Sequence, residues 1–190
     1  YGMVFLAAGR SSRYGETQEN KLLAEKNGKP MFRYLLDQMK DFSMCTRTVV
    51  SRIPQILEYA QDHDMLNVEN AEPEKGISLS LKLGMEACLK QNPQLQGILF
   101  AVCDQPALKA QTIEQILEMA VKNPGKIICA GTKDCLGNPV LLDKRYFPEL
   151  MELKGDIGGK QVVKKHLDQV LLCETLKQEL RDIDEKSQDW

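Results

Sequence analysis

An aspartate at the end of a strongly apolar run is the first residue of this sequence that suggests chemistry. Asp104 directly follows Gly97–Cys103 and is followed by Gln105 and Pro106. A carboxylate at the end of a buried strand costs free energy unless a cation compensates its charge. Mg²⁺ prefers carboxylate and phosphate oxygens, which makes Asp104 the best candidate for a metal ligand. A turn-forming aspartate is the competing interpretation, because Asp and Pro are both common in turns.

A loop of small and basic residues follows the first apolar run. The residues of interest are Leu6, Ala7, Ala8, Gly9, Arg13 and Lys21. Small residues let backbone N–H groups approach a ligand, and successive N–H groups can form a concave anion site. With two added positive charges, such a loop suits a triphosphate, whose negative charge must be offset before a nucleophile approaches. The loop is neither a Walker motif nor GxGxxG, and a tight solvated turn would have the same glycine spacing.

A second segment of small residues begins at Gly76 and contains Ser78 and Ser80. Apolar residues recur at helical spacing over Leu79–Lys90, so we expect a helix there with Ser78 as its N-cap. A serine hydroxyl there could hydrogen-bond a ligand, and the helix N-terminus would favour an anionic group. A serine cap on an amphipathic helix explains the same residues without a ligand, and both interpretations can hold together.

Taken together, these segments resemble the motifs of the MobA-like nucleotidyltransferases, a family that includes the molybdenum cofactor cytidylyltransferases. The first loop is similar to LAAGxSxRxG followed by Lys, the second to GxSxSLxxG, and Asp104-Gln105-Pro106 to DQP. The resemblance implies that Arg13 and Lys21 act on the triphosphate and that Asp104 binds the catalytic Mg²⁺. The nucleotide-binding residues so implied are Leu6, Ala7, Ala8, Gly9, Arg13, Lys21, Gly76, Ser78 and Ser80.

The identity of the base depends on one position of the first loop. Family members that use GTP usually read LAGG here, whereas this chain has Ala8 where those proteins have glycine. A methyl group at that position would crowd a purine and favour the smaller pyrimidine. The resemblance therefore favours CTP over GTP.

Two further segments resemble the acceptor side of the family's site. One matches the family's G-x-P turn, and the other is similar to GDxGAR. The acceptor-side residues so implied are Gly137, Asn138, Pro139 and Asp156. Lys160 stands where the family has Arg, which keeps the positive charge but loses the bidentate fork. An ordinary turn and a glycine-rich helix start are the alternatives without a ligand.

Near the C-terminus, Asp182-Ile183-Asp184 resembles the family's DID sequence, whose second aspartate completes the metal site. Carried over to this chain, the implied metal ligands are Asp104 and Asp184. The Thr-Pro that normally follows DID is absent here, and a solvated acidic tail is the alternative interpretation.

The resemblance implies an enzyme that transfers CMP from CTP to the phosphate of a molybdopterin-type molybdenum cofactor and releases pyrophosphate. The implied partners are CTP, the molybdopterin-type cofactor and a recipient molybdenum hydroxylase, and the implied cofactor is Mg²⁺. Two alternatives stay open. One is a cytidylyltransferase or other NTP transferase that acts on a polyol or sugar phosphate. The other is a non-catalytic relative that binds the nucleotide or the cofactor.

Strand-like and helix-like segments must alternate to position these residues. The strands are expected at Met3–Ala7, Thr46–Ser51, Leu66–Glu69, Gly97–Cys103, Lys126–Ala130, Pro139–Leu142 and Gln169–Cys173. The helices are expected at Met31–Met39, Gln55–Gln61, Leu79–Lys90, Gln111–Val121 and Gly158–Leu167. This alternation is typical of a mainly parallel sheet covered by helices. We expect one α/β domain over residues 1–190, Rossmann-like and three-layered (α/β/α), with the mainly parallel mixed sheet of nucleotide-diphospho-sugar transferases that the resemblance implies.

Composition sets the remaining limits. The chain has 190 residues, 43% of them hydrophobic and 27% charged, with a formal net charge of −2. This balance gives no overall basic field for nucleic acid, and no apolar run approaches the roughly 20 residues that span a bilayer. The six cysteines form no CxxC pair and indicate reduced thiols in a cytoplasmic protein. We therefore expect neither nucleic acid nor a membrane as a partner.

Overall fold

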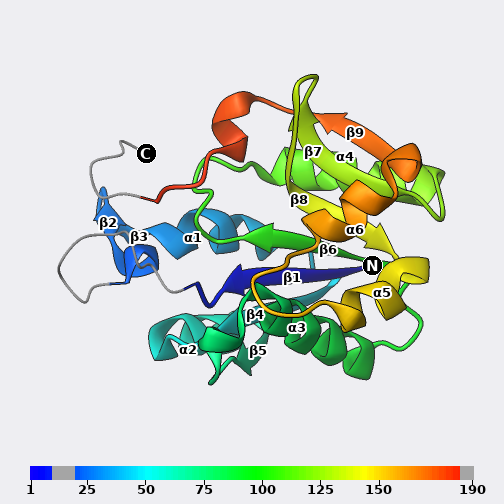
Figure 1. The fold of residues 1–190 in the computed structure, drawn as a ribbon. Helices are drawn as coiled ribbons and strands as arrows, with labels where there is room; N and C mark the ends of the chain where they lie inside the picture. The colour runs from blue at the N-terminus through cyan, green and yellow to red at the C-terminus, as the bar shows by residue number, and fades with distance from the viewer. Residues whose placement is uncertain (10–19, 185–190) are drawn as a thin grey trace.

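A seven-stranded sheet forms the centre of the chain (Figure 1). The computed structural model describes residues 1–9 and 20–184. The strands are β1 (Gly2–Ala7), β4 (Thr46–Ser51), β5 (Leu66–Glu69), β6 (Gly97–Val102), β7 (Ile127–Thr132), β8 (Cys135–Asp143) and β9 (Val170–Glu174). Their order is β5-β4-β1-β6-β8-β7-β9, and only β8 runs antiparallel to its neighbours in this described sheet. The mainly parallel mixed sheet that the sequence predicts is confirmed.

Helices cover both faces of the sheet and give the expected α/β/α layers (Figure 1). They are α1 (Met31–Leu36), α2 (Pro54–Asp62), α3 (Ile77–Gln91), α4 (Ala110–Lys122), α5 (Phe147–Glu152) and α6 (Lys160–Lys165). The buried residues of α1, α2 and α4 pack in one core cluster, and those of α3, α5 and α6 pack in another. In the part of the chain that the structure describes, no helix combines the length and the apolar character needed to cross a membrane.

Alternation along β1 assigns neighbouring residues to opposite faces of the sheet. Met3, Phe5 and Ala7 pack in the cluster that contains the buried residues of α1. Val4 and Leu6 pack in the cluster that contains those of α3. Because side chains of a strand alternate between its two faces, Leu6 and Ala7 point in opposite directions. Leu6 is therefore the residue near the end of β1 that faces α3.

The carboxyl ends of β1, β4 and β6 lie at one edge of the sheet, because these strands are parallel. β4 pairs with one side of β1 and β6 with the other. An open α/β sheet binds its ligands in the crevice at such a switch point, outside the carboxyl ends of the strands. Ala8 and Gly9 follow β1 at this edge, and Asp104 follows β6 closely.

Several elements differ from the sequence-based expectations. β8 begins earlier than expected, at Cys135, because it forms a hairpin with β7. The short helix α5 (Phe147–Glu152) was not expected, and α6 ends before Leu167. The predicted N-cap of α3 is wrong: Gly76 holds that position and Ser78 lies inside the first turn.

The segment that carries Lys21 is a fixed turn. It forms the 3₁₀ turn η1 (Lys21–Leu23), in which the Asn20 side chain accepts a hydrogen bond from the Leu22 N–H at 3.0 Å. Leu22 is buried in the core, and α1 packs against the turn. Lys21 therefore has a defined position even though the preceding residues 10–19 lie outside the described part of the chain.

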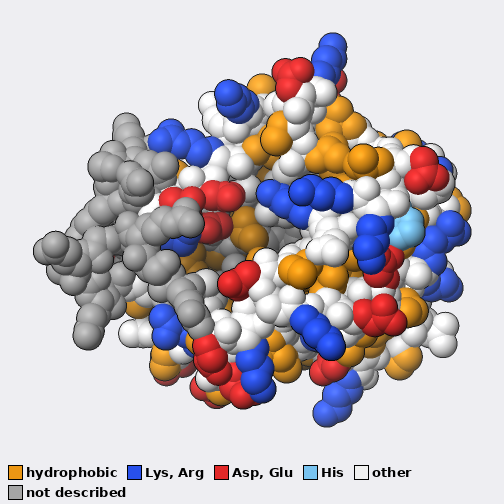
Figure 2. Space-filling view, viewed as in Figure 1, with side chains coloured by type: hydrophobic (Ala, Val, Ile, Leu, Met, Phe, Trp, Pro, Cys, Tyr) orange, Lys and Arg blue, Asp and Glu red, His pale blue; other side chains and the backbone are white. Residues whose placement is uncertain are grey.

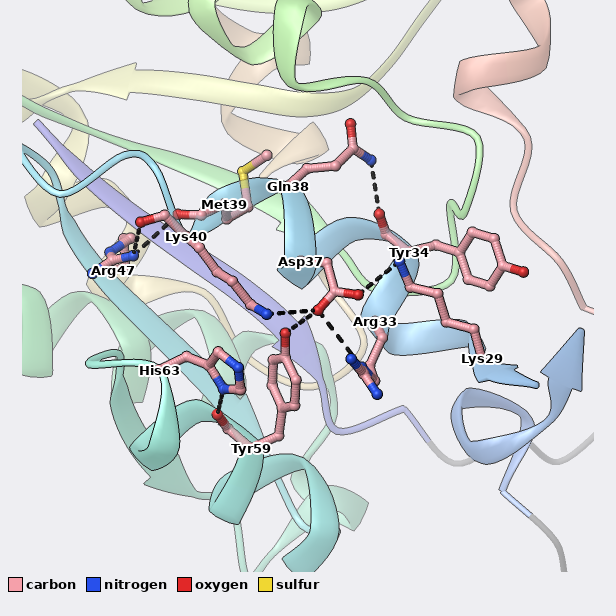
Figure 3. A network of polar contacts seen from close by, with 10 residues as sticks. All are labelled: Lys29, Arg33, Tyr34, Asp37, Gln38, Met39, Lys40, Arg47, Tyr59 and His63. Atoms are coloured by element: carbon pink, nitrogen blue, oxygen red, sulfur yellow. Dashed lines mark hydrogen bonds and ion pairs between the residues drawn. The ribbon is translucent and has the colours of Figure 1, made fainter. Parts of the chain in front are cut away.

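A network of ion pairs joins the end of α1 to α2 (Figure 3). The Asp37 carboxylate lies 2.7 Å from Lys29 Nζ and 3.1 Å from Lys40 Nζ. It also accepts a hydrogen bond from the Tyr59 hydroxyl of α2. Burial acts to raise the pKa of Asp37, but the hydrogen bonds from Lys29, Tyr59 and Lys40 hold it well below its usual range. The charged carboxylate thus holds α1, and the turn that packs on it, against the body of the fold.

The start of α3 is in close contact with the loop that follows α5. Gly76 has φ +84°, and an added Cβ would lie 2.3 Å from the Gly155 carbonyl carbon. The Ser78 N–H donates to the Gly155 carbonyl oxygen at 3.2 Å. These contacts hold Gly155 and Asp156 across the beginning of α3.

We expect Gly76→Ala to lower the free energy of unfolding by about 2–4 kcal/mol, because it combines a strained φ with a backbone clash. Gly28→Ala is the matched control. Gly28 also has a positive φ, +72°, but no atom lies within 4 Å of an added Cβ, so we expect a loss of only about 1 kcal/mol. Urea denaturation measures both variants. Equal losses would contradict the close contact between Gly76 and the loop.

Candidate active site

A cavity of about 320 Å³ opens at the carboxyl ends of β1 and β6. Small residues form part of its lining, namely Ala8, Gly9 and Gly76. Lys21 and Ser80 add polar groups to the same cavity. The lining therefore combines close backbone approach with one cation, as a site for a phosphorylated ligand requires.

A second cavity, of about 410 Å³, lies toward β8. One part of its lining is apolar and consists of Leu81, Phe100, Val140 and Leu142. The polar side chains of its lining are Asn138, Lys160, Asp182, Asp104 and Asp156. Figure 2 shows a hollow on this face of the molecule, where hydrophobic side chains lie between acidic and basic ones. This cavity suits a ligand with an apolar body and a charged end.

The two cavities meet at Asp104. Leu6, Ile77, Val102, Asp104 and Asp156 line both of them. Leu6 and Val102 come from the ends of β1 and β6, and Ile77 is the first residue of α3. Two ligands bound side by side would therefore approach each other next to the Asp104 carboxylate.

A buried lysine joins two carboxylates at this junction. Lys21 Nζ lies 2.7 Å from Asp104 Oδ2 and 3.1 Å from Asp184 Oδ1. The Lys21 side chain is 10% exposed, and that of Asp104 is 22% exposed. Burial acts to lower the pKa of Lys21, but Asp104, together with Asp184, raises it above its usual value. The ammonium group therefore stays charged and offsets the two negative charges.

The donor set at this junction fits a hard divalent cation. Asp104 Oδ1 is buried and has no hydrogen-bond partner among the described residues. Within residues 1–9 and 20–184, no three His, Cys, Asp or Glu side chains converge as a ready-made metal site. A cation on Asp104 and Asp184 would take its other ligands from phosphate oxygens and water, as Mg²⁺ commonly does.

The segment that carries Asp184 is attached directly to the turn after β6. The Ile183 N–H donates to the Asp104 carbonyl at 3.0 Å, and the Ile183 side chain is buried in the core. Gln105 donates hydrogen bonds to Leu180 and Asp182 of the same segment. The segment Leu180–Asp184 is therefore attached to the turn that carries Asp104, and its Asp182 lines the second cavity, while the Asp184 side chain is 49% exposed.

Most of the residues expected to bind the nucleotide lie around the first cavity. Leu6, Ala8, Gly9, Lys21, Gly76 and Ser80 line it. Ala7 does not, because it points to the opposite face of β1. Ser78 does not line either cavity; it is buried in the first turn of α3. Arg13 lies outside the described residues.

Of the four residues expected on the acceptor side, two line the second cavity and two do not. Asn138 and Asp156 line the second cavity. Gly137 packs against Leu180, where an added Cβ would lie 3.1 Å from its side chain, and neither Gly137 nor Pro139 lines a cavity.

Asp182 and Lys160 were not among the expected site residues, although both line the second cavity. Both lie in segments that resemble family motifs, and that resemblance was the signal that could have identified them. Gln105 also stands in such a segment, Asp104-Gln105-Pro106, but the sequence indicated only a turn there, because its side-chain bonds reach residues 75 and 77 positions away.

A family model described as the MobA-like NTP transferase domain matches residues 3–170. Among solved structures, a nucleotidyl transferase from Methanothermobacter thermautotroptrophicus is 22% identical, with a TM-score of 0.79 over 98% of this chain and 92% of its own. Rv0371C from Mycobacterium tuberculosis H37Rv in complex with manganese is 21% identical, with a TM-score of 0.72 over 92% of this chain and 89% of its own. The 4-diphosphocytidyl-2C-methyl-D-erythritolsynthase of Anaerococcus prevotii DSM 20548 is 15% identical, with a TM-score of 0.72 over 97% of this chain and 90% of its own.

A comparison with curated proteins gave no match. The solved structures share the fold of this chain, and the family match covers most of its length, including Asp104 and both loops. The chain is therefore a nucleotidyltransferase of the MobA-like NTP transferase family.

Proposed function

We propose that this chain transfers CMP from CTP to the phosphate of a molybdopterin-type molybdenum cofactor and releases pyrophosphate. The observation that supports this most strongly is the meeting of two different cavities at Asp104. A transferase must bring the α-phosphate of one ligand to the nucleophile of another, and the proposed reaction needs this geometry.

The first cavity is the proposed nucleotide site. Ala8, Gly9 and Gly76 allow backbone N–H groups to approach the nucleotide, and Lys21 supplies positive charge to the triphosphate. Arg13, outside the described residues, is proposed to act beside Lys21. Ala8 lines the cavity, which supports the expectation that a pyrimidine is preferred over a purine.

Asp104 and Asp184 are the proposed ligands of Mg²⁺. The buried, unpartnered Asp104 Oδ1 supports this role. A relative of similar fold has been solved with manganese, a divalent cation of the same hard class. When bound, the cation would supply Lewis-acid polarisation of the α-phosphate and charge neutralisation.

The second cavity is the proposed acceptor site. Its apolar wall, which includes Phe100 and Leu142, favours an acceptor with a ring system over a hydrated polyol. Lys160 forms no ion pair with another described residue, so it is the proposed partner of the acceptor phosphate in place of the family's Arg. Asn138 and Asp156 would orient the polar edge of the acceptor.

The proposed reaction needs no nucleophile from the protein. A phosphate oxygen of the acceptor attacks the α-phosphorus of CTP in line, and the bond from that phosphorus to the β-phosphate oxygen breaks, so pyrophosphate leaves with its electron pair. The acceptor phosphate is already ionised, because the second pKa of a phosphate monoester is about 6. Lys21 and Lys160 hold the two anions against their repulsion, and this positioning accounts for most of the acceleration.

The proposal extends to the domain organisation of the chain, its cellular location and the recipient of its product. We propose that residues 1–190 act as one nucleotidyltransferase domain in the cytoplasm, where its six free cysteines stay reduced. The product would pass to a recipient molybdenum hydroxylase. An acceptor of the polyol or sugar phosphate class is the competing possibility, since one structural neighbour is named as a 4-diphosphocytidyl-2C-methyl-D-erythritol synthase.

We expect Asp104→Asn to lower turnover by about 100-fold or more while leaving the fold intact, since it removes one charged group that acts on the reacting phosphate. Asp143→Asn is the matched control: this aspartate also ends a strand, but it caps a 3₁₀ turn through the Arg145 N–H. Pyrophosphate release measures turnover, and thermal unfolding measures the fold. Near-normal turnover of Asp104→Asn would reject the assignment.

The nucleotide preference is tested by thermal unfolding with CTP, GTP, ATP or UTP in the presence of Mg²⁺. At 100 times its Kd, CTP should stabilise the chain by about 2.7 kcal/mol, a shift of roughly 5–10 °C for a domain of this size. GTP should give a smaller shift, and Ala8→Gly should raise the GTP shift. A GTP shift larger than that of CTP would overturn the cytidylyl assignment. Acceptor assays with a molybdopterin-type cofactor and with polyol phosphates then separate the two acceptor classes.

A further inference from the structure

Gln105 is a buried residue whose two side-chain hydrogen bonds in the described part of the chain both reach the C-terminal segment. It is 1% exposed. Its Nε2 donates to the Leu180 carbonyl at 3.1 Å and to Asp182 Oδ1 at 2.8 Å. The Ile183 N–H adds a third bond by donating to the Asp104 carbonyl at 3.0 Å. The turn after β6 and the C-terminal segment are therefore connected at three points.

These bonds help to fix the course of the C-terminal segment, together with the hydrogen bonds that Glu179 accepts from the Lys109 N–H and the Thr112 hydroxyl. After β9, at the far edge of the sheet, the chain passes through the 3₁₀ turn η6 (Lys177–Leu180) and returns to the carboxyl end of β6 (Figure 1). Asp184 follows immediately and reaches Lys21 Nζ at 3.1 Å. The distance between the Asp184 and Asp104 carboxylates therefore depends on how Leu180–Asp184 is held against the turn after β6.

The two ends of the Gln105 amide differ in their contacts. The Oε1 atom is buried and has no hydrogen-bond partner among the described residues. An apolar side chain of similar size would remove this unsatisfied acceptor, but it would leave the Leu180 carbonyl and Asp182 without the donor that Nε2 provides. What the amide supplies, and an apolar side chain cannot, is a donor to two acceptors of the C-terminal segment.

We propose that Gln105 is a positioning residue, which fixes Leu180–Asp184 against the turn after β6 and so sets the spacing of the Asp104 and Asp184 carboxylates. This inference rests on the proposed function, in which those carboxylates hold the divalent cation. Gln105 itself touches neither the cation nor the substrates.

The test compares Gln105→Met with Arg47→Met in the full chain. Arg47 is likewise buried and donates to backbone carbonyls, those of Met39 and Lys40 among them, but it lines neither cavity. Binding of Mn²⁺ with CTP is followed by electron paramagnetic resonance. We expect Gln105→Met to weaken Mn²⁺ binding by about 10-fold or more, as loss of a residue that orients a metal ligand does. Arg47→Met should leave Mn²⁺ binding unchanged at a similar or larger loss of thermal stability.

A second readout separates positioning from general destabilisation. In Gln105→Met, raising the Mn²⁺ concentration should restore part of the lost turnover, and hydrogen exchange should become faster at the Ile183 amide. Should Gln105→Met fail to fold, Gln105→Glu takes its place: it keeps the size, removes the donor and sets a second carboxylate beside Asp182, so Mn²⁺ binding should again weaken.

The outcomes distinguish the inference from the proposed function. Mn²⁺ affinity equal to that of the wild type in the folded Gln105 variant overturns the inference alone, provided that Asp104→Asn loses Mn²⁺. A wild-type chain that binds no Mn²⁺ with any nucleotide overturns the proposed function and the inference together. A matching loss of Mn²⁺ binding in Arg47→Met also overturns the inference, because the effect would then reflect stability alone.

Discussion

The site depends on keeping two negative charges close together in a crevice that is partly shielded from water. Asp104 and Asp184 both lie within ion-pair distance of Lys21 Nζ, at 2.7 and 3.1 Å. Repulsion between such carboxylates grows as water is excluded, so a compensating cation is required at every stage. Lys21 supplies it in the unliganded chain, which explains why a lysine is buried here. The turn η1, the Asp37 network behind it and the C-terminal segment all serve to keep these three groups in place.

The order of the strands explains why two dissimilar cavities meet at one carboxylate. β1 and β6 are parallel neighbours, so both chains leave the sheet at the same edge. Small residues after β1 and at the start of α3, together with Lys21, line the cavity on one side of Asp104. The antiparallel β8 adds Val140 and Leu142 to the lining of the cavity on the other side. In the proposed reaction this division separates a polyanionic nucleotide from an acceptor with an apolar body.

Local sequence patterns were enough to predict much of the fold and part of the site. The strands at Thr46–Ser51 and Leu66–Glu69 could be predicted because the first is rich in β-branched residues and the second alternates between apolar and polar residues. Residues that follow strands, such as Asp104 and Gly9, were also predictable, since the ends of parallel strands converge. Ala7 belongs to the first loop by sequence, but the pleat of β1 turns its side chain into the core. A serine before an apolar run is a common helix start and favours Ser78 as the cap, whereas Gly76 holds the N-cap position of α3.

Contacts between distant segments could not be predicted. The carbonyl of Gly155 fills the space beside Gly76, so this glycine is explained by a loop 79 positions later, which no local pattern reveals. The partners of Gln105 lie on a segment that returns from the far edge of the sheet, and its sequence signal was a turn alone. Asp182 entered the site for the same reason, because the bonds that hold Leu180–Asp184 form only after the whole sheet has assembled.

The position of the cation in a crystal soaked with CTP and Mn²⁺ tests the proposed site most directly. We expect an anomalous manganese peak within coordination distance of Asp104 and Asp184, with the cytosine base beside Ala8 in the first cavity. A manganese peak away from Asp104, or a nucleotide whose phosphates lie outside the junction of the two cavities, would contradict it.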